Sequence, residues 1–340
     1  MVKEARLDFR GVKPKRKRKE IVSGEERNEK GKLMWPAFWD APYVPEDWLI
    51  EPLLPRGRSI AMYCVAGIGK SELALFVSVK AALGEHFLDK SKSDPLEVAY
   101  LDYEMTSNDV KERLMAQGYD RDTDLSHLHY YLLPTLPPLD TRPGGDALLQ
   151  LCRDDNIDLV VIDTTSRVIT GDEGLSDTLR DFHEHSGRRL KELGITIWRL
   201  DHAGKNLAAG QRGTSAKNDD VDIIWSLQRT RSGVRLHAEK RRQDWVPEDL
   251  NLTRRQNPLW YGFSDDLLKE RYAQRLRSLI SKMRELQIPR DSTVRGARAV
   301  LRNANVPAKQ DLLVDALRRR KRNAKTELGN KKVTQNGNRP

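Results

Sequence analysis

Residues 58–73 read RSIAMYCVAGIGKSEL, and this stretch decides the fold. An apolar run that ends at Val65 passes into a glycine-bearing turn, and a helical run begins at Glu72. The backbone N–H groups of such a turn, together with the N-terminus of the helix that follows, converge on anionic oxygens. The order of strand, glycine turn and helix therefore predicts a loop that binds phosphate.

The turn matches the GxxxxGK[ST] pattern of nucleotide-binding loops with one exception. Cys64 occupies the position of the first glycine, at the strand end, where a small residue can substitute. Lys70 would reach the β- and γ-phosphates, and the Ser71 hydroxyl would ligate Mg²⁺. A glycine turn with a chance Lys-Ser pair is the alternative, but the strand before it and the helix after it argue against that. We predict that ATP and Mg²⁺ bind here, on Ala66, Gly67, Ile68, Gly69, Lys70 and Ser71.

Beyond this loop, apolar runs alternate with helical stretches, which is the pattern of a mostly parallel α/β sheet. In such sheets, ligands bind beyond the carboxyl ends of the strands. Strands are predicted over residues 98–105, 127–133 and 158–166, and helices over 107–118, with Ser107 as N-cap, and 176–194. Residues 221–229 and 233–242 predict a hairpin of two further strands.

Two carboxylates at predicted strand ends complete the expected site. VVIDTTS (160–166) ends its apolar run in Asp163, which can hold Mg²⁺ directly or through water. YLDYEM (100–105) carries Asp102 and Glu104, and we expect Glu104, which is nearer the tip, to orient and deprotonate an attacking water. The alternative for each is an acid that only terminates a strand.

At this point the motifs carry a family resemblance. CVAGIGKS, YLDYEM, VVIDTTS and RLDHAGK, in this order and spacing, resemble the RecA-like ATPases, and most closely the branch of hexameric replicative helicases of the RepA and DnaB kind. The similarity covers roughly residues 45–245 and implies an α/β, RecA-like P-loop NTPase core. In that family a glutamate after the second strand is the catalytic base, which maps to Glu104. A polar residue after the fourth strand senses the γ-phosphate, which maps to His202, although this histidine could equally cap its strand.

The resemblance also implies a catalytic site that two subunits share. The family uses basic residues on a late strand, and HAEKRRQ (237–243) supplies Lys240 and Arg242 at a Lys-x-Arg spacing. A guanidinium there would stabilise charge that develops at the γ-phosphate. The competing interpretation is a basic strand end on the surface. If the first interpretation holds, the protein must form a homo-oligomer, which the resemblance suggests is a hexamer.

A loop at residues 204–220 would line the central channel of such a ring. In the resembling family this region contacts nucleic acid, and Lys205 and Arg212 are the expected phosphate contacts on single-stranded DNA. Residues 169–177 would form the companion loop, but their acids argue against direct DNA contact.

The charge distribution also indicates a polyanionic partner. The net charge is +10, yet residues 1–34 carry +6, residues 271–340 carry +14, and the part between them carries −10. An acidic core with basic flanks fits nucleic acid most simply. KPKRKRK (13–19) could be a nuclear-import sequence, a nucleic-acid arm or a solubilising run, and the sequence does not decide among them.

Composition and the positions of structure-breaking residues divide the chain into five parts. We predict a disordered basic tail (1–34), a lead-in rich in Trp and Pro (35–57), the ATPase core (58–262), a helical module (265–322) and a disordered tail (323–340). The tryptophans of the lead-in are expected to pack on the core or on a neighbouring subunit rather than to stack on bases.

The helical module has the outline of a helix-turn-helix unit. Apolar residues recur every three or four positions over 265–287, and two shorter helices are expected over 292–304 and 309–322. The last of these ends in a basic cluster suited to phosphate contact, in which we single out Arg318, Arg319 and Arg320. A plain three-helix packing module is the alternative.

Several classes of protein are excluded. No apolar run is long enough to span a membrane, and the N-terminus lacks the apolar core of a signal peptide. Cys64 and Cys152 stand far apart and support no disulfide framework. We therefore expect a protein that is not secreted and that is cytoplasmic or nucleoid-associated.

The sequence thus predicts an ATPase that acts on nucleic acid, most simply a ring-forming DNA helicase of replicative type. An ATP-gated DNA-binding protein that does not unwind, such as a recombination mediator or a replication-initiator adaptor, is the main alternative. A small-molecule P-loop kinase shares the phosphate loop but explains neither the basic flanks nor the Lys-x-Arg strand.

Overall fold

The computed structural model describes residues 28, 31–41, 43, 46–85, 93–171, 176–202, 220–263, 265–304, 306, 308, 310 and 312–321. The predicted disordered tails fall mostly or wholly outside these residues. So does the predicted channel loop with Lys205 and Arg212.

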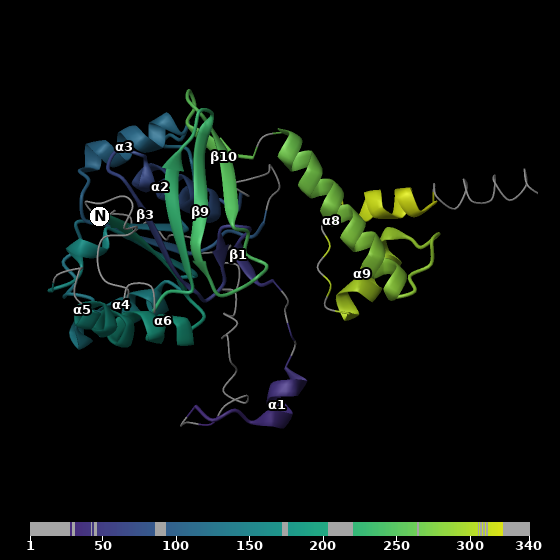
Figure 1. The fold of residues 1–340 in the computed structure, drawn as a ribbon, viewed down its shortest axis with the longest axis horizontal. Coiled ribbons are helices and arrows are strands. Elements are labelled where there is room, and N and C mark those ends of the chain that lie inside the picture. Colours follow the sequence, from purple (N-terminus) through teal and green to yellow (C-terminus); the bar gives the residue numbers. More distant parts are fainter. Residues whose placement is uncertain are drawn as a thin grey trace, which may run out of the picture.

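The described residues form a nine-stranded sheet in the order β11-β10-β9-β8-β3-β7-β6-β4-β5 (Figure 1). The six strands from β8 to β5 run parallel, and β9, β10 and β11 join antiparallel at one side. This confirms the predicted α/β fold with a mostly parallel sheet. The strands are β3 (Ser59–Cys64), β4 (Val98–Asp102), β5 (Leu128–Leu132), β6 (Leu159–Asp163), β7 (Thr196–His202), β8 (Ile223–Arg229), β9 (Gly233–Arg241), β10 (Asp249–Arg255) and β11 (Trp260–Gly262).

Helices cover both faces of the sheet because its strands are apolar on both sides. Along β4, Val98 and Tyr100 share a cluster with residues of α2, whereas Ala99 and Leu101 share one with residues of α4. The two-residue period of a strand sends these pairs to opposite faces. The helices are α2 (Lys70–Ala82) and α3 (Ser107–Ala116) on the first face, and α4 (Arg142–Asp154), α5 (Ser176–Phe182) and α6 (Arg188–Glu192) on the second.

The single helix predicted over 176–194 is interrupted. A π-helical turn, η2 (His183–Gly187), separates α5 from α6. Gly145 of α4 lies directly against it, and a Cβ at this position would come within 2.0 Å of the carbonyl oxygen of His185. Close packing of α4 on this turn therefore requires glycine. A shorter 3₁₀ turn, η1 (Thr165–Arg167), directly follows β6.

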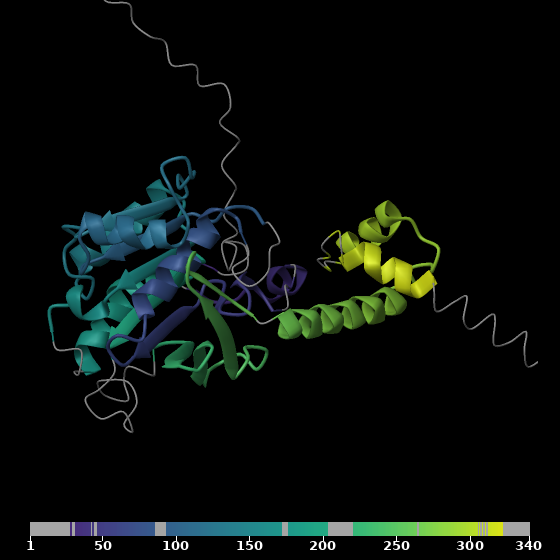
Figure 2. The same ribbon diagram turned by 90° about the horizontal axis from the view of Figure 1, so that it is seen from above.

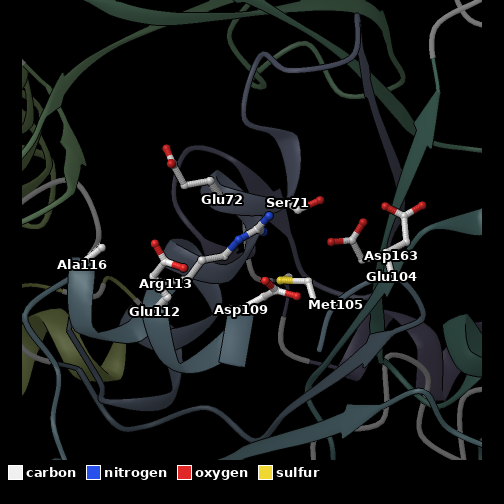
Figure 3. Close-up of a pocket in the computed structure, with 9 residues that line it drawn as sticks. All are labelled: Ser71, Glu72, Glu104, Met105, Asp109, Glu112, Arg113, Ala116 and Asp163. Carbon is white, nitrogen blue, oxygen red and sulfur yellow. The ribbon is translucent and has the colours of Figure 1, made fainter. Parts of the chain in front are cut away.

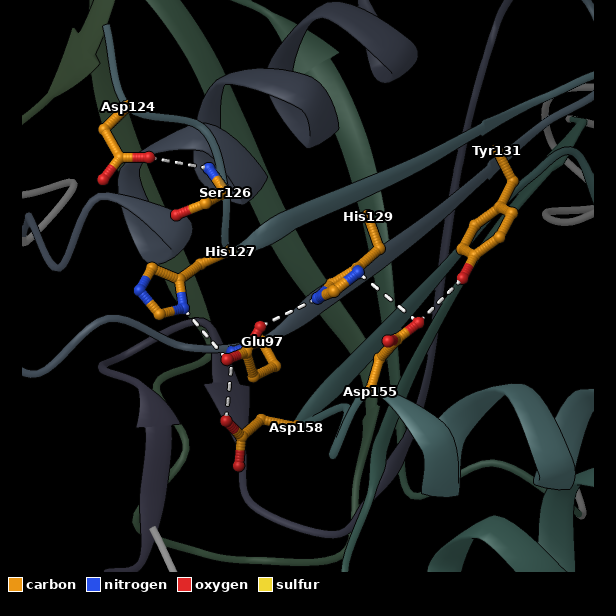
Figure 4. Close-up of polar contacts among 8 residues, drawn as sticks. All are labelled: Glu97, Asp124, Ser126, His127, His129, Tyr131, Asp155 and Asp158. Carbon is orange, nitrogen blue, oxygen red and sulfur yellow. Dashed lines mark hydrogen bonds and ion pairs between the residues drawn. The ribbon is translucent and has the colours of Figure 1, made fainter. Parts of the chain in front are cut away.

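Polar contacts hold the edge strand β5 at its amino end (Figure 4). Nδ1 of His127 and Nε2 of His129 lie 2.9 and 2.8 Å from the two carboxylate oxygens of Glu97. The hydroxyl of Tyr131 donates to Asp155 at 3.1 Å. Glu97 precedes β4 and Asp155 follows α4, whereas His127 directly precedes β5 and His129 and Tyr131 lie within it. The contacts therefore hold β5 against β4 and the end of α4.

The C-terminal helices form a small core of their own, as the sequence predicted. They are α8 (Asp265–Glu285), α9 (Val294–Asn303) and a helix over 312–321. Leu276, Met283, Leu301, Leu313 and Leu317 are among the residues buried between them. We call these helices the C-terminal module. α8 leads away from the sheet in both views (Figures 1 and 2), and Arg275 pairs with Glu51 of the lead-in.

The lead-in contains α1 (Trp35–Asp40) and a small hairpin of β1 (Trp48–Ile50) and β2 (Leu54–Pro55). Trp48 packs edge-on against Trp245 with ring centroids 4.6 Å apart, as predicted for packing on the core. α1 buries no residue. None of the helices in the described part of the chain has the length and apolar character that crossing a membrane requires.

The N-cap of α3 is Thr106, one residue before the predicted Ser107. The Thr106 hydroxyl accepts from the backbone N–H of Asp109, and the Asp109 carboxylate accepts from the backbone N–H of Thr106. This reciprocal pair is a capping box, which satisfies two backbone donors that a helix leaves unpaired.

We predict that Thr106→Ala lowers the free energy of unfolding by about 1 kcal/mol, because the helix loses its side-chain cap. Chemical denaturation measures this change. Ser107→Ala is the matched control, and it should alter stability by less than about 0.5 kcal/mol. Equal losses in the two variants would contradict the assignment of the cap.

Candidate functional site

The phosphate loop lies between β3 and α2, as predicted. Gly67 and Gly69 have φ values of +81° and +105°, in the left-handed region that favours glycine. Gly69 is the N-cap of α2, so the backbone N–H groups of the first turn face the loop. Cys64 is the last residue of β3 and is buried, which explains why a residue other than glycine fits there. Burial raises the pKa of its thiol.

Lys70 is directed into the end of the sheet. It is only 8% exposed, and its Nζ donates to the backbone carbonyl of Asp201 at 3.2 Å. Asp201 belongs to β7, the strand directly beside β3. The ammonium group therefore lies at the carboxyl ends of the central strands, where a bound phosphate would meet it.

Asp163 and Ser71 form an oxygen-rich corner beside this lysine. Asp163 is 1% exposed, and it accepts a hydrogen bond of 2.9 Å from the hydroxyl of Tyr100 on its Oδ2. Its Oδ1 is buried and has no hydrogen-bond partner among the described residues. Burial raises the pKa of Asp163, and the Ser71 hydroxyl and the Lys70 ammonium offset only part of that effect. An unsatisfied carboxylate oxygen beside a hydroxyl fits the oxygen ligands that Mg²⁺ prefers.

Asp102 and Glu104 lie in different surroundings. β4 ends at Asp102, which is fully buried and accepts from the backbone N–H groups of Glu104 and Met105 and from the Tyr130 hydroxyl. These contacts make Asp102 a structural residue of the turn. Glu104 lies beyond the strand and is accessible, and the Thr164 hydroxyl donates to it at 3.2 Å.

The candidate residues meet in one cavity of about 490 Å³ between the start of α2 and α3 (Figure 3). Ser71, Asp163 and Glu104 line it together. His202, at the end of β7, lies beside it, with Nε2 3.7 Å from Oε1 of Glu104. The structure thus brings together the expected metal ligands, the expected base and the expected sensor from four different strand ends.

Arg113 is a residue of this cavity that the sequence did not single out. It extends from α3 toward Ser71 at the start of α2 (Figure 3), and its Nη1 is buried without a hydrogen-bond partner in the described part of the chain. The helix periodicity at 107–118 was visible in the sequence. The direction of Arg113 toward the phosphate loop could not be predicted, because it depends on how α3 packs.

The other wall of the cavity carries a fixed acid, Glu72. Arg254 donates to both of its oxygens at 2.9 and 3.0 Å, and the Tyr261 hydroxyl donates to it as well. Burial alone would raise the pKa of Glu72, but these hydrogen bonds bring it below its ordinary value. The first turn of α2 is thereby tied to β10 and β11.

Arg229 is a second residue that sequence analysis missed. It ends β8, and its Nη2 donates to the backbone carbonyl of Gly67 at 3.3 Å. β8 runs parallel to β3 on the side away from β7, so its carboxyl end reaches the phosphate loop. The sequence predicted this strand but could not place it beside β3.

Lys240 and Arg242 lie at the opposite end of the sheet from the phosphate loop of the same chain. β9 runs antiparallel to β8, and the last residues of β9 pair with the first of β8. Arg242 lies 3.7 Å from the buried carboxylate of Asp222, which Lys191 also contacts at 2.8 Å. These basic residues therefore cannot serve their own chain's loop, and any role at a γ-phosphate would belong to a neighbouring copy.

The predicted nucleic-acid contacts on the C-terminal module divide into two groups. Arg318 and Arg319 are exposed. Arg320 is only 7% exposed and donates from Nη2 to the carbonyl of Ile288 at 2.7 Å, so the prediction of a phosphate contact is wrong for this residue in the described arrangement. Burial and the neighbouring Arg284 and Arg290 lower the pKa of its guanidinium.

Asp163→Asn should raise thermal stability at neutral pH, although it removes a carboxylate that we expect to bind metal. Because the folded-state pKa of Asp163 is raised, the stability linked to this group is present at low pH and lost as the pH rises through that pKa. Asparagine avoids the cost of the buried charge, and we expect a melting temperature about 2–4 °C higher, the shift that roughly 1 kcal/mol produces.

The test is a series of melting curves between about pH 4 and pH 8 without nucleotide or metal. The gain should shrink as the pH falls. Asp249→Asn is a control of opposite sign, because a hydrogen bond from Arg235 lowers the pKa of Asp249 and its carboxylate is favoured in the fold. A gain that does not vary with pH would contradict the argument.

Comparison with known proteins agrees with this geometry. No curated protein matches the sequence closely enough to count as a relative. The profile of a family described as AAA domain, AAA_25, matches residues 25–208, more than half of the chain. This family consists of P-loop NTPases with a RecA-like fold and includes ATPases of the DnaB and RepA type. The matched range contains the phosphate loop, Glu104, Asp163 and His202. The chain therefore belongs to the AAA_25 family of AAA domains and is a P-loop ATPase.

Proposed function

We propose that this protein couples ATP hydrolysis to binding and translocation on nucleic acid, as a ring-forming DNA helicase of replicative type. The observation that carries the hydrolysis step is the cavity in which Ser71, Asp163 and Glu104 converge. An ATPase needs an activated water in line with the γ-phosphate. Of the three exposed carboxylates among the described residues that line the cavity, Asp109 and Glu112 lie on α3, and Glu104 is the one that follows a strand of the sheet.

In this mechanism different residues of the chain bind the phosphates, hold the metal ion and activate the water. The phosphate loop and Lys70 bind and orient the β- and γ-phosphates, and Ser71 and Asp163 would hold Mg²⁺, which neutralises phosphate charge when bound. Glu104 accepts the proton of the attacking water, and the hydrogen bond from Thr164 holds its carboxylate in place. His202, beside Glu104, occupies the end of β7 and can report the state of the γ-phosphate to the loop that follows it.

The position of Lys240 and Arg242 supports a catalytic site shared between copies. They lie far from their own phosphate loop, at the amino ends of the parallel strands. A cation supplied by a neighbour would stabilise the charge that develops in phosphoryl transfer. We therefore propose a homo-oligomeric ring, a hexamer by analogy with the family.

The charge distribution supports nucleic acid as the partner. Residues 271–340 carry +14, and Arg318 and Arg319 are exposed on the last helix of the C-terminal module. Such a surface binds the phosphate backbone and positions the protein without reading sequence. We propose that the ring channel binds single-stranded DNA and that the C-terminal module tethers the ring to DNA, in the context of DNA replication.

The second candidate function is an ATP-gated DNA-binding protein that does not unwind. The C-terminal module favours it, because it has its own apolar core and could bind DNA independently of a motor. Separation of DNA strands driven by ATP would exclude this alternative.

The first experiment is steady-state ATP hydrolysis with and without single-stranded DNA. We expect DNA to stimulate the wild-type rate several-fold. Glu104→Gln should bind ATP but lose at least 100-fold in kcat, because removal of a general base costs about 10²–10⁴. Glu192→Gln, which removes an exposed carboxylate on α6, is the control and should leave the rate unchanged.

The outcomes separate the candidates. Hydrolysis that responds to DNA and depends on Glu104 supports the motor, and unwinding of a forked duplex then distinguishes a helicase from a gated binder. Hydrolysis that is indifferent to every nucleic acid tested would rule out the translocase.

Arg229→Gln tests the contact between β8 and the phosphate loop. Loss of a charge-assisted hydrogen bond to the Gly67 carbonyl should raise the Kd for a non-hydrolysable ATP analogue about 3- to 10-fold, in line with about 1 kcal/mol. Fluorescence titration measures it. Arg231→Gln, two residues farther along the same hairpin, is the matched control, and equal weakening in both variants would point to general electrostatics instead.

A further inference from the structure

Four aromatic residues before the core have no place in the function described so far. Trp35, Phe38 and Trp39 lie on α1 and Tyr43 follows it, and we call these four residues the aromatic arm. Their exposed fractions are 59, 36, 76 and 81%, in chain order. Exposure of this many large rings next to one another is unusual for a surface that faces only water.

Within the described chain, the three rings of α1 contact one another. Trp35 and Phe38 meet edge to face at 5.7 Å between centroids, and Phe38 and Trp39 at 5.1 Å. None of the four belongs to an apolar cluster of the described residues. Trp48 shows the contrast, because it packs against Trp245 of the same chain. Figure 1 shows α1 well separated from the sheet and from α9.

The area involved is large enough for an interface. A buried aromatic side chain accounts for about 150–250 Å², so the exposed parts of the arm offer roughly 400–600 Å² of apolar surface. Counted on both partners, this is roughly 800–1,200 Å², close to the lower limit of specific protein interfaces. Tryptophan is also the residue type that contributes most often as an anchor in such interfaces.

Charge identifies the surface that suits the arm. Residues 34–47 contain Asp40, Glu46 and Asp47 and no lysine or arginine. The complementary surface of the molecule is the C-terminal module, which is strongly basic and carries exposed apolar groups, Tyr272 and Val300. The ion pair between Arg275 and Glu51 shows that a residue just beyond this acidic segment already pairs with the module.

We propose that the aromatic arm of one copy docks on the C-terminal module of a second copy. The rings would pack on exposed apolar groups of the module, such as Tyr272 or Val300, and the acids of the arm would face its arginines, such as Arg295 and Arg302 on α9. The arm and the module are different surfaces, so the contact is head to tail. A head-to-tail contact builds a closed ring or a filament rather than a two-fold dimer.

This inference does not depend on the proposed helicase function. It concerns how copies hold together, and an arm-linked assembly can form whatever the substrate of the ATPase is. The test therefore measures the mass of the assembly and identifies the contact between copies. ATP hydrolysis is measured only to distinguish this proposal from the proposed function.

The first measurement is the mass of the full-length chain in solution by sedimentation equilibrium. The wild type should form assemblies that are multiples of 39.0 kDa. The double variant Trp35→Ala with Trp39→Ala should weaken assembly at least 30-fold in Kd, as loss of an anchor worth about 2 kcal/mol implies. Met115→Ala removes an equally exposed apolar side chain from the core and should leave the mass unchanged.

The second measurement identifies the contact. A photoreactive benzoylphenylalanine replaces Trp39 in a mixture of isotope-labelled and unlabelled full-length chains. We expect cross-links that join labelled to unlabelled chains and that end within residues 272–321. Cross-links confined to one chain, cross-links to the ATPase core, or none at all would overturn the proposal, as would a wild type that is monomeric at all concentrations.

The two proposals can fail separately. If the arm variants remain assembled and hydrolyse ATP in response to DNA, the docking proposal is wrong and the motor stands. If the arm variants dissociate but hydrolysis never responds to nucleic acid, the docking proposal stands and the translocase is wrong. Because α1 buries no residue, the double variant should keep the core folded. Circular dichroism and melting curves of this variant verify that it does.

Discussion

The register of four parallel strands is the constraint on which the site depends. Cys64 pairs with His202 across β3 and β7, and Asp102 pairs with Asp163 across β4 and β6. β7 extends two residues past the end of β6, because Asp163 pairs with Leu200. The strands therefore end within two residues of one another, and the phosphate loop, the expected metal ligands and the turn that bears Glu104 meet at one end of the sheet. A slip of one residue in any of these strands would send its side chains to the opposite face and dismantle the site.

The register also places buried charged groups at this end of the sheet. Asp163 and Lys70 are almost fully buried, and the Tyr100 hydroxyl and the Asp201 carbonyl give each one a partner within the sheet. The raised pKa of Asp163 indicates that this arrangement lowers stability at neutral pH. A cost of this kind is common where a site is organised to bind an ion or a transition state rather than to stabilise the fold.

The sequence was sufficient for residues whose role follows from local pattern. Lys70 and Ser71 begin the helix that follows the glycine turn, Asp163 ends an apolar strand, and the structure places them together. Arg113 and Arg229 could not be found in this way, because they reach the site through the packing of α3 and through the position of β8 beside β3. The burial of Arg320 was accessible from the sequence, since Leu313, Ala316, Leu317 and Arg320 share the three- and four-residue spacing of one helix face.

Two surfaces of the described chain lie away from its own catalytic cavity, and both bear on how copies could assemble. Lys240 and Arg242 lie at the end of the sheet that is remote from their own phosphate loop, and the aromatic arm extends away from the core that it precedes. In our proposals, the first surface would meet the phosphate loop of a neighbouring copy, and the second would meet the C-terminal module of one. Both contacts are head to tail, and a ring can contain both only if the same rotation between neighbouring copies satisfies each of them. The arm would therefore limit the positions in which a neighbour's cations can approach the bound nucleotide.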